Sequence, residues 1–152
     1  MGIESFVDRQ LKFYKKNITS DINKKGLKII CQHGFDVELG FLIIEPTTSI
    51  CEIKENIISL QKLDIFAQIH YNQAFFSIGA VLYSIKGTDI FDYVKSHNLY
   101  ANNSIGYKFQ DSDVEEYYES LCVWQKNMEQ YNYIKFLIDK AIAQKDNIAE
   151  KN

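Results

Sequence analysis

Apolar side chains recur every three or four residues along most of this chain, a spacing that places them on one face of a helix. Charged residues such as Glu4 and Lys12 fill the positions between them near the N-terminus. The pattern predicts a first amphipathic helix there, and Thr19 can start a second one. The apolar residues of the first helix are Ile3, Phe6, Val7, Leu11 and Tyr14.

The stretch from residue 27 to residue 44 admits two interpretations. Its segments LKIIC and GFLII are typical of two buried strands on either side of Gly34, which would give a small hairpin at 27–45. We favour one long helix that ends before Pro46, and keep the hairpin as the alternative. The residues that share a helical stripe here are Leu27, Ile30, Gly34, Val37, Phe41 and Ile44.

Ser49 and Glu52 mark the start of the next helix. A serine followed three residues later by a glutamate fits a capping box, in which each side chain bonds the backbone N–H of the other residue. The apolar pattern then continues from Ile50 to Tyr71, with Asp64 as its polar break. We therefore predict a helix from this box to about Tyr71.

Further helices are expected in the second half of the chain. Residues 73–86 predict a buried helix that Gly87 closes, and Thr88 can cap a short helix after it. Residues 98–112 are polar and predict the longest loop, with a short strand near residues 107–109.

A second capping box, Ser112 with Glu115, opens the C-terminal region. We expect residues after Lys145 to fray. The first apolar stripe of this region comprises Val114, Tyr117, Leu121, Trp124 and Met128. The last one comprises Tyr131, Ile134, Ile138 and Ala141.

These stretches predict a mainly α fold: a single helical domain over residues 1–152, built as a bundle of about six or seven helices arranged as helical hairpins. An α+β fold with a small hairpin at 27–45 is the alternative. The chain has 152 residues, 46% of them hydrophobic and 24% charged, as expected for one ordinary globular domain.

Composition also limits the cellular setting. A formal charge of −3 argues against a nucleic-acid partner, and the longest apolar run, Gly40 to Ile44, is too short to span a bilayer. The cysteines are widely spaced without a CxxC pair, which favours neither disulfides nor zinc. We expect a cytoplasmic protein without membrane contact, with reduced and buried thiols at Cys31, Cys51 and Cys122.

No pattern of residues indicates catalysis. The histidines, His33, His70 and His97, have no metal-ligand spacing, and phosphate-binding loops are absent from the sequence. His70 with Asp64 or Glu52 would be a base with its orienting carboxylate, but an ordinary partly buried histidine is favoured over it. We expect no catalytic residue, no metal and no cofactor.

The densest acidic run lies beside aromatic residues near residue 115. Such a run is often a solvated face with favourable charges at a helix N-terminus. We predict instead that it docks a basic protein partner, since charge steers the encounter and aromatic side chains anchor it. The predicted contacts are Asp111, Asp113, Glu115, Glu116, Tyr117, Tyr118 and Glu119. The seven bases within residues 9–28 are an alternative surface for an acidic partner.

The segment QAFFSIGAVLYSIKG resembles the first helix of a tetratricopeptide repeat, because four of its residues fall on that repeat's aromatic, Leu, Gly and Tyr positions. These residues are Phe75, Ile78, Gly79 and Leu82. The second helix of the repeat is not matched, since Asp92 and Ser96 stand where it wants a small residue and an aromatic one.

In size, acidity, aromatic content and helical-hairpin texture, the chain also resembles the small immunity proteins with which bacteria neutralise secreted toxins. This resemblance implies a tight complex with a cognate toxin domain, often a nuclease with a basic cleft. We therefore expect a non-catalytic binding protein of the immunity type. A secretion chaperone or helical-repeat adaptor, a small uncharacterised enzyme, and a homodimer formed through the C-terminal helices are the alternatives.

Overall fold

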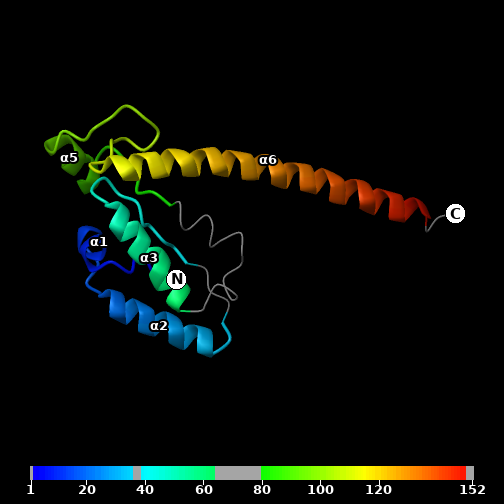
Figure 1. The fold of residues 1–152 in the computed structure, drawn as a ribbon, viewed down its shortest axis with the longest axis horizontal. Coiled ribbons are helices and arrows are strands. Elements are labelled where there is room, and N and C mark those ends of the chain that lie inside the picture. The colour runs from blue at the N-terminus through cyan, green and yellow to red at the C-terminus, as the bar shows by residue number, and fades with distance from the viewer. Residues whose placement is uncertain (1, 36–38, 64–79, 150–152) are drawn as a thin grey trace. The chain divides into compact units, whose positions relative to one another are not determined.

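Helices dominate the fold in the computed structural model, which describes residues 2–35, 39–63 and 80–149 (Figure 1). The mainly α prediction is confirmed, although the described residues contain five helices rather than six or seven. None of these helices is both long and apolar enough to cross a membrane. The described helices are α1 (Asp8–Phe13), α2 (Ser20–Gln32), α3 (Ile50–Lys62), α5 (Asp89–Ser96) and α6 (Ser112–Ala149).

The chain forms two compact units, an N-terminal unit of residues 1–115 and a C-terminal unit of residues 116–152. The N-terminal unit contains α1, α2, α3, α5 and the first turn of α6. The rest of α6 is the described element of the C-terminal unit.

Three predicted helix starts are confirmed by their caps. The side chains of Thr19, Ser49 and Thr88 each accept the backbone N–H three residues further on, at the starts of α2, α3 and α5. The capping box at Ser49 is complete, because the Glu52 side chain also accepts the Ser49 N–H. The helix predicted to reach Tyr71 ends at Lys62, and its expected last residues lie outside the described ones.

The prediction of one helix through residues 27–44 is wrong. α2 ends at Gln32, and Gly34 follows it with φ of 73°, in the left-handed region that glycine tolerates. Residues 43–45 are buried one after another, which suits a fully buried extended segment and not one face of a helix.

The alternative hairpin at 27–45 does not form within the described residues either, because the extended segment pairs with other parts of the chain. The Leu42 N–H donates to the carbonyl of Glu4 (2.8 Å), and Ile44 forms a parallel bridge with Val81. Burial of Ile44 therefore depends on segments that lie about 40 residues away in either direction, as the numbering shows.

The helix predicted for residues 73–86 is wrong over 80–86, and residues 73–79 lie outside the described ones. Here the chain is extended: the Leu82 N–H donates to the Ile44 carbonyl and the Ser84 N–H to the Ile105 carbonyl, both at 2.9 Å. Leu82 is one of the four positions that resemble a tetratricopeptide repeat, and it is not helical. The other three lie outside the described residues.

Residues 98–112 form a packed connection. Ile105, Tyr107 and Phe109 are buried at every second position, and Tyr107 forms an antiparallel bridge with Tyr100. Gly106 has φ of 86°, and a Cβ atom on it would lie 2.8 Å from the Ser84 carbonyl oxygen. Of the short strand predicted near 107–109, the described residues show the bridge at Tyr107, and the sequence did not indicate how deeply these residues are buried.

Polar side chains form part of the core of the N-terminal unit. Gln10 and Asn56 are fully buried, and Asn23 is 4% exposed. Gln10 donates to the Ile43 carbonyl (2.8 Å), while Asn56 donates to the Gln10 side-chain oxygen (2.9 Å) and accepts the Phe6 N–H (2.7 Å). These hydrogen bonds join α1, α3 and the extended segment. Separating the segments would leave buried polar groups without a hydrogen bond, at a cost of about 1–3 kcal/mol each.

Candidate functional site

An open groove of about 630 Å³ lies in the N-terminal unit between α1, α5 and two extended segments. Its lining is mainly aromatic and aliphatic: Phe13, Tyr14, Leu42, Leu82, Tyr83, Ile85, Ile90 and Tyr93. Its other lining residues are Glu4, Lys15, Lys16, Thr88 and Asp89.

The aromatic residues of the groove hold one another in place. Phe13 of α1 meets Tyr93 of α5 edge to face, with ring centroids 5.3 Å apart. The Tyr14 hydroxyl donates to the Leu42 carbonyl at 2.5 Å. Burial raises the pKa of Tyr14 well above its usual range, so the side chain is a neutral phenol that fixes the groove wall.

The charged residues of the groove form two ion pairs, and each pair joins a lysine to a carboxylate. Lys16 lies 2.7 Å from Glu4, and Lys15 is bonded to Asp89. The bond from Lys15 holds the pKa of Asp89 below its usual range. Because each base is balanced by an acid, the four charges add up to zero around the apolar wall.

Two apolar side chains at the edge of the groove are open to solvent. Tyr83 is 54% exposed and Ile85 is 63% exposed, although both belong to a segment whose neighbour Val81 is buried. Tyrosine is one of the residue types that contribute most of the binding energy at protein interfaces. The groove can thus accept apolar side chains of a protein partner.

A second polar cluster in the N-terminal unit is structural. Arg9 donates to buried Glu45 (2.7 Å), to Glu52 (2.8 Å) and to the Thr47 hydroxyl (2.9 Å). Burial by itself would raise the pKa of Glu52, but its bonds with Arg9 and with the Ser49 N–H outweigh this and lower it. The cluster joins α1 to the start of α3 and keeps the Glu52 carboxylate charged.

The acidic run that the sequence singled out begins with a structural residue. The Asp111 carboxylate accepts the N–H groups of Ile50 (3.1 Å) and Asp113 (3.0 Å). It occupies the capping place at the start of α6 that was predicted for Ser112, because it directly precedes the first helical residue. The Asp111 carboxylate is therefore used for hydrogen bonds within the N-terminal unit.

The other predicted contacts divide between the two units. Asp113 and Glu115 belong to the N-terminal unit, and the remaining four belong to the C-terminal unit. Burial raises the pKa of Tyr117, so its hydroxyl stays neutral. The exposed residues are Asp113, Glu115, Glu116 and Glu119, and the half-buried ones are Tyr117 and Tyr118. A role for them in partner binding stays a prediction.

The described histidines lie at the ends of helices. His33 follows α2, and the His97 ring stacks on Tyr93 at 4.0 Å, with its Nδ1 2.9 Å from the Tyr93 carbonyl. His70 lies outside the described residues, and Glu52, its hypothetical orienting carboxylate, is bonded to Arg9. Among the described residues, no group of His, Cys, Asp and Glu could hold a metal ion.

The prediction that all three thiols are buried is wrong. Cys31 is buried, which raises the pKa of its thiol, whereas Cys51 and Cys122 are exposed. Each of the three is a free cysteine. The positions of Cys51 and Cys122 within apolar stretches of sequence suggested burial. Cys51 lies on α3 and Cys122 on α6, and both side chains are on exposed sides of these helices.

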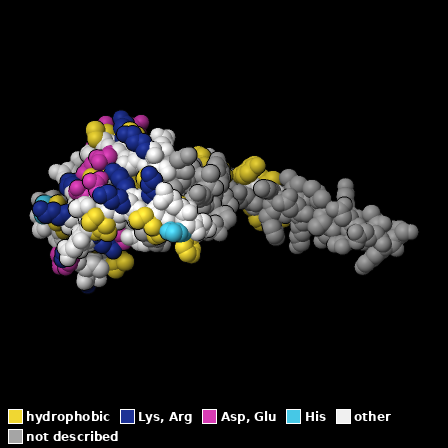
Figure 2. Space-filling model, turned by 90° about the horizontal axis from the view of Figure 1, so that it is seen from below, with side chains coloured by type: hydrophobic (Ala, Val, Ile, Leu, Met, Phe, Trp, Pro, Cys, Tyr) yellow, Lys and Arg dark blue, Asp and Glu magenta, His cyan; other side chains and the backbone are white. Residues whose placement is uncertain are grey.

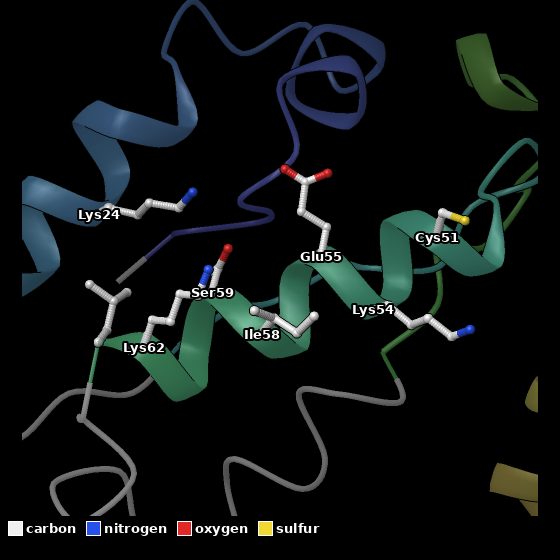
Figure 3. Close-up of a pocket in the computed structure, with 8 residues that line it drawn as sticks. Lys24, Cys51, Lys54, Glu55, Ile58, Ser59 and Lys62 are labelled. Carbon is white, nitrogen blue, oxygen red and sulfur yellow. The ribbon is translucent and has the colours of Figure 1, made fainter.

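A smaller pocket of about 490 Å³ runs along α3 (Figure 3). Lys24 reaches it from α2, and its three lysines outnumber its one glutamate. An ammonium on a flexible stem does not form an ordered site by itself. The residues of α3 and its end that line it are Cys51, Lys54, Glu55, Ile58, Ser59, Lys62 and Leu63.

Sequence reasoning missed the groove because it treated residues 80–86 as helix. A signal was present, since the segment VLYSI is rich in the β-branched and aromatic residues that favour strands. The groove also depends on contacts between α1 and α5, which are about 75 residues apart in the numbering and leave no local pattern.

Comparisons with protein-family models, with curated proteins and with solved structures gave no significant match. The function therefore has to be argued from the groove and from the surface of the described residues.

Proposed function

We propose that this protein is a non-catalytic binding protein that neutralises a folded toxin by covering part of its surface, as immunity proteins do. The observation that carries the proposal is the neutral, aromatic-lined groove in the N-terminal unit. It offers apolar contact area, and its four charged side chains are paired with each other.

The groove suits a folded partner that inserts one or two apolar side chains. Tyr83 and Ile85 stand at its edge with more than half of their surface exposed. On binding they would lose this contact with water, which is the usual arrangement of an interface centre. The surrounding ion pairs then provide a polar rim.

The acidic residues near the start of α6 support a basic partner. Asp113, Glu115, Glu116 and Glu119 are exposed and carry one sign of charge. On the face in Figure 2, by contrast, basic and acidic side chains are interspersed. An excess of one charge in a short run would steer a basic toxin domain toward the chain.

The first experiment isolates the partner and tests its activity. The tagged chain is expressed in its native host, and a bound protein is identified by mass spectrometry and then produced alone and together with this chain. The proposal expects a stoichiometric folded partner that stops cell growth alone and is harmless in the complex. Recovery of unfolded clients would favour a secretion chaperone over an immunity protein. Recovery of no partner would overturn the proposal.

The second experiment assigns the surface. Ile85→Glu places a charge in the groove and is expected to weaken binding at least about tenfold in a calorimetric titration. Ile22→Glu is the matched control, since Ile22 is 55% exposed on α2 and does not line the groove. Equal affinity of the two variants would remove the groove from the proposal.

The acidic residues are tested separately by replacing Asp113, Glu116 and Glu119 together by Lys. The proposal expects weaker partner binding, with the loss greatest at low salt, and an unchanged unfolding transition. Unchanged affinity in the same titration would remove these residues from the interface and leave the groove as the binding surface.

A further inference from the structure

Ser59 is a buried residue of α3 whose hydroxyl has no hydrogen-bond partner among the described residues. It is 8% exposed, and its side chain lines the pocket of about 490 Å³ along α3. A serine within a helix often donates to the carbonyl four residues earlier, but no such bond joins Ser59 to Glu55. A buried hydroxyl without a partner is uncommon, and this one is suited to a ligand that accepts its hydrogen bond.

Two lysines line the same pocket from different elements. Lys24 reaches it from α2, and Lys62 is the last residue of α3. In Figure 3 the ends of both side chains and the Ser59 hydroxyl lie on the same side of α3, the side toward α2, whereas Lys54 points away from them. Neither Lys24 nor Lys62 forms an ion pair with a described carboxylate, so both ammonium groups can meet an anion. The Lys24 ammonium lies 5.7 Å from the centre of the Phe6 ring.

The charges and donors of the pocket suit a phosphate group. Three lysines and one glutamate, Glu55, are among its lining residues, although the whole chain has a formal charge of −3. Two ammonium groups and a hydroxyl can donate to the three terminal oxygens of one phosphate, and lysine is a common phosphate-binding residue. The planar carboxylate is matched best by arginine, and the described lining of this pocket contains none.

The pocket is larger than a phosphate group and has an apolar wall. Its volume of about 490 Å³ falls within the range of about 300–1,000 Å³ that is usual for small-molecule sites. Ile58 is 46% exposed there, and Leu63 is half-buried at the end of α3. These two side chains can contact an apolar group that is attached to the phosphate.

We propose that the pocket along α3 binds a small phosphate ester. Ser59 supplies the fixed donor, since it is buried within the helix, and the ammonium groups of Lys24 and Lys62 close around the phosphate. Ile58 and Leu63 contact the apolar part of the ester. The proposal does not rest on the proposed function, because the groove shares no lining residue with this pocket.

An NMR titration of the full chain with phenyl phosphate tests the site, with sodium chloride at matched ionic strength as the reference. The amide signals of Ser59 and Lys62 should shift and saturate, with a Kd of about 1 mM or less. Inorganic phosphate should move the same signals with lower affinity, and benzoate should bind more weakly than phenyl phosphate. The absence of a saturable shift up to about 20 mM phenyl phosphate would overturn the proposal.

The two other anions test which part of the ligand is recognised. If benzoate bound more tightly than phenyl phosphate, the assignment of a phosphate group would be wrong. If inorganic phosphate bound as tightly as phenyl phosphate, the pocket would be a site for the free ion, and the assignment of an ester would be wrong.

Ser59→Ala separates binding from folding. This variant should bind phenyl phosphate at least about tenfold more weakly, because it loses a hydrogen bond to a charged acceptor. Its thermal unfolding midpoint should not fall, since the change removes a buried hydroxyl that has no partner in the free chain. An unchanged affinity of Ser59→Ala would overturn the proposal.

Charge variants test the lysines against a matched control. Lys24→Gln and Lys62→Gln should each weaken binding by about threefold to tenfold, whereas Glu55→Gln should strengthen it by about twofold, because a repulsive carboxylate is removed. Lys28→Gln is the control, since Lys28 is exposed on α2 one turn after Lys24 and does not line the pocket. Equal losses in Lys24→Gln and Lys28→Gln would indicate a general attraction of anions to α2 and would overturn the site.

Discussion

In the N-terminal unit, polar side chains such as Gln10 and Asn56 lie in the core and bond to each other, whereas in the C-terminal unit apolar side chains such as Tyr131 and Ile134 lie at the surface. A buried amide is tolerated when its partners come from the same chain. An exposed apolar side chain contributes little to stability, because it is the removal of apolar surface from water that stabilises the folded chain. The buried amides thus find their partners within the N-terminal unit, whereas part of the apolar surface of α6 stays in contact with water.

The largest expected effect comes from comparing two tyrosines, one in each unit. Tyr107 is fully buried and its hydroxyl donates to the Leu82 carbonyl (2.7 Å), whereas Tyr133 is 63% exposed. Tyr107→Ala should lower the free energy of unfolding by about 4 kcal/mol, and Tyr133→Ala by less than about 0.5 kcal/mol. Urea denaturation measures both, and similar losses would mean that the two regions are packed alike.

A pair of glycines sharpens the description of the N-terminal unit. Gly106→Ala combines a left-handed backbone with a Cβ atom 2.8 Å from the Ser84 carbonyl oxygen, and should cost about 3 kcal/mol. Gly34→Ala has the same backbone problem but meets no atom of the described residues within 4 Å, and should cost about 1 kcal/mol. Thermal unfolding compares them, and equal costs would show that the close approach at residue 106 relaxes easily.

A pair of aspartates separates structure from surface in the acidic run. Asp111→Ala removes the acceptor of two backbone N–H groups and should cost about 1–2 kcal/mol. Asp113→Ala removes an exposed carboxylate and should change the free energy of unfolding by no more than about 0.5 kcal/mol. If Asp113→Ala were the more damaging change, Asp111 would not be the cap of α6.

The smallest effect is a pH dependence. The pKa of Glu52 is lower in the folded chain than in the unfolded one, so its contribution is present above about pH 5 and lost as the pH falls through the folded pKa. Because Glu52 is partly exposed, the contribution should stay below about 1 kcal/mol. Glu52→Gln should flatten the fall in stability between about pH 5 and pH 3, and Lys54→Gln should not. A wild-type slope in Glu52→Gln would contradict the role of this carboxylate.

Local signals in the sequence predicted much of the helical framework. Caps depend on residues three positions apart, so Thr19, Ser49 and Thr88 identified the starts of α2, α3 and α5. The apolar pattern also identified Ile3 and Phe6 as core residues, although both precede α1 and are not helical. Burial follows from the apolar pattern more directly than the type of element does.

The extended segments could not be predicted in the same way, because their partners are distant in the sequence. Ile44 is buried through contact with Val81, and this pairing leaves no periodic pattern. The polar core was also missed, although Asn56 stands three residues after Ile53 and four before Leu60, on the buried side of α3. A pattern of apolar residues does not include such a position, although its side chain forms hydrogen bonds that join α3 to α1.

The groove could be predicted neither from the helix caps nor from the apolar pattern. Its walls come from α1, α5 and the segments around Leu42 and Leu82, which meet only after these distant pairings form. The acidic run was visible in the sequence as a cluster of one charge, but the sequence could not show that Asp111 caps α6. Distinguishing a structural acid from a free one required the position of the Ile50 N–H.

The single backbone bonds between extended segments also set an order for folding during synthesis. Glu4 has its partner at Leu42, Ile44 at Leu82, and Ser84 at Ile105, so each link waits for a segment made later. On the ribosome, the N-terminal segment therefore emerges long before its last neighbour exists. The unit can close only when residues near 110 have left the exit tunnel, and until then its apolar segments depend on chaperones or on speed to avoid aggregation.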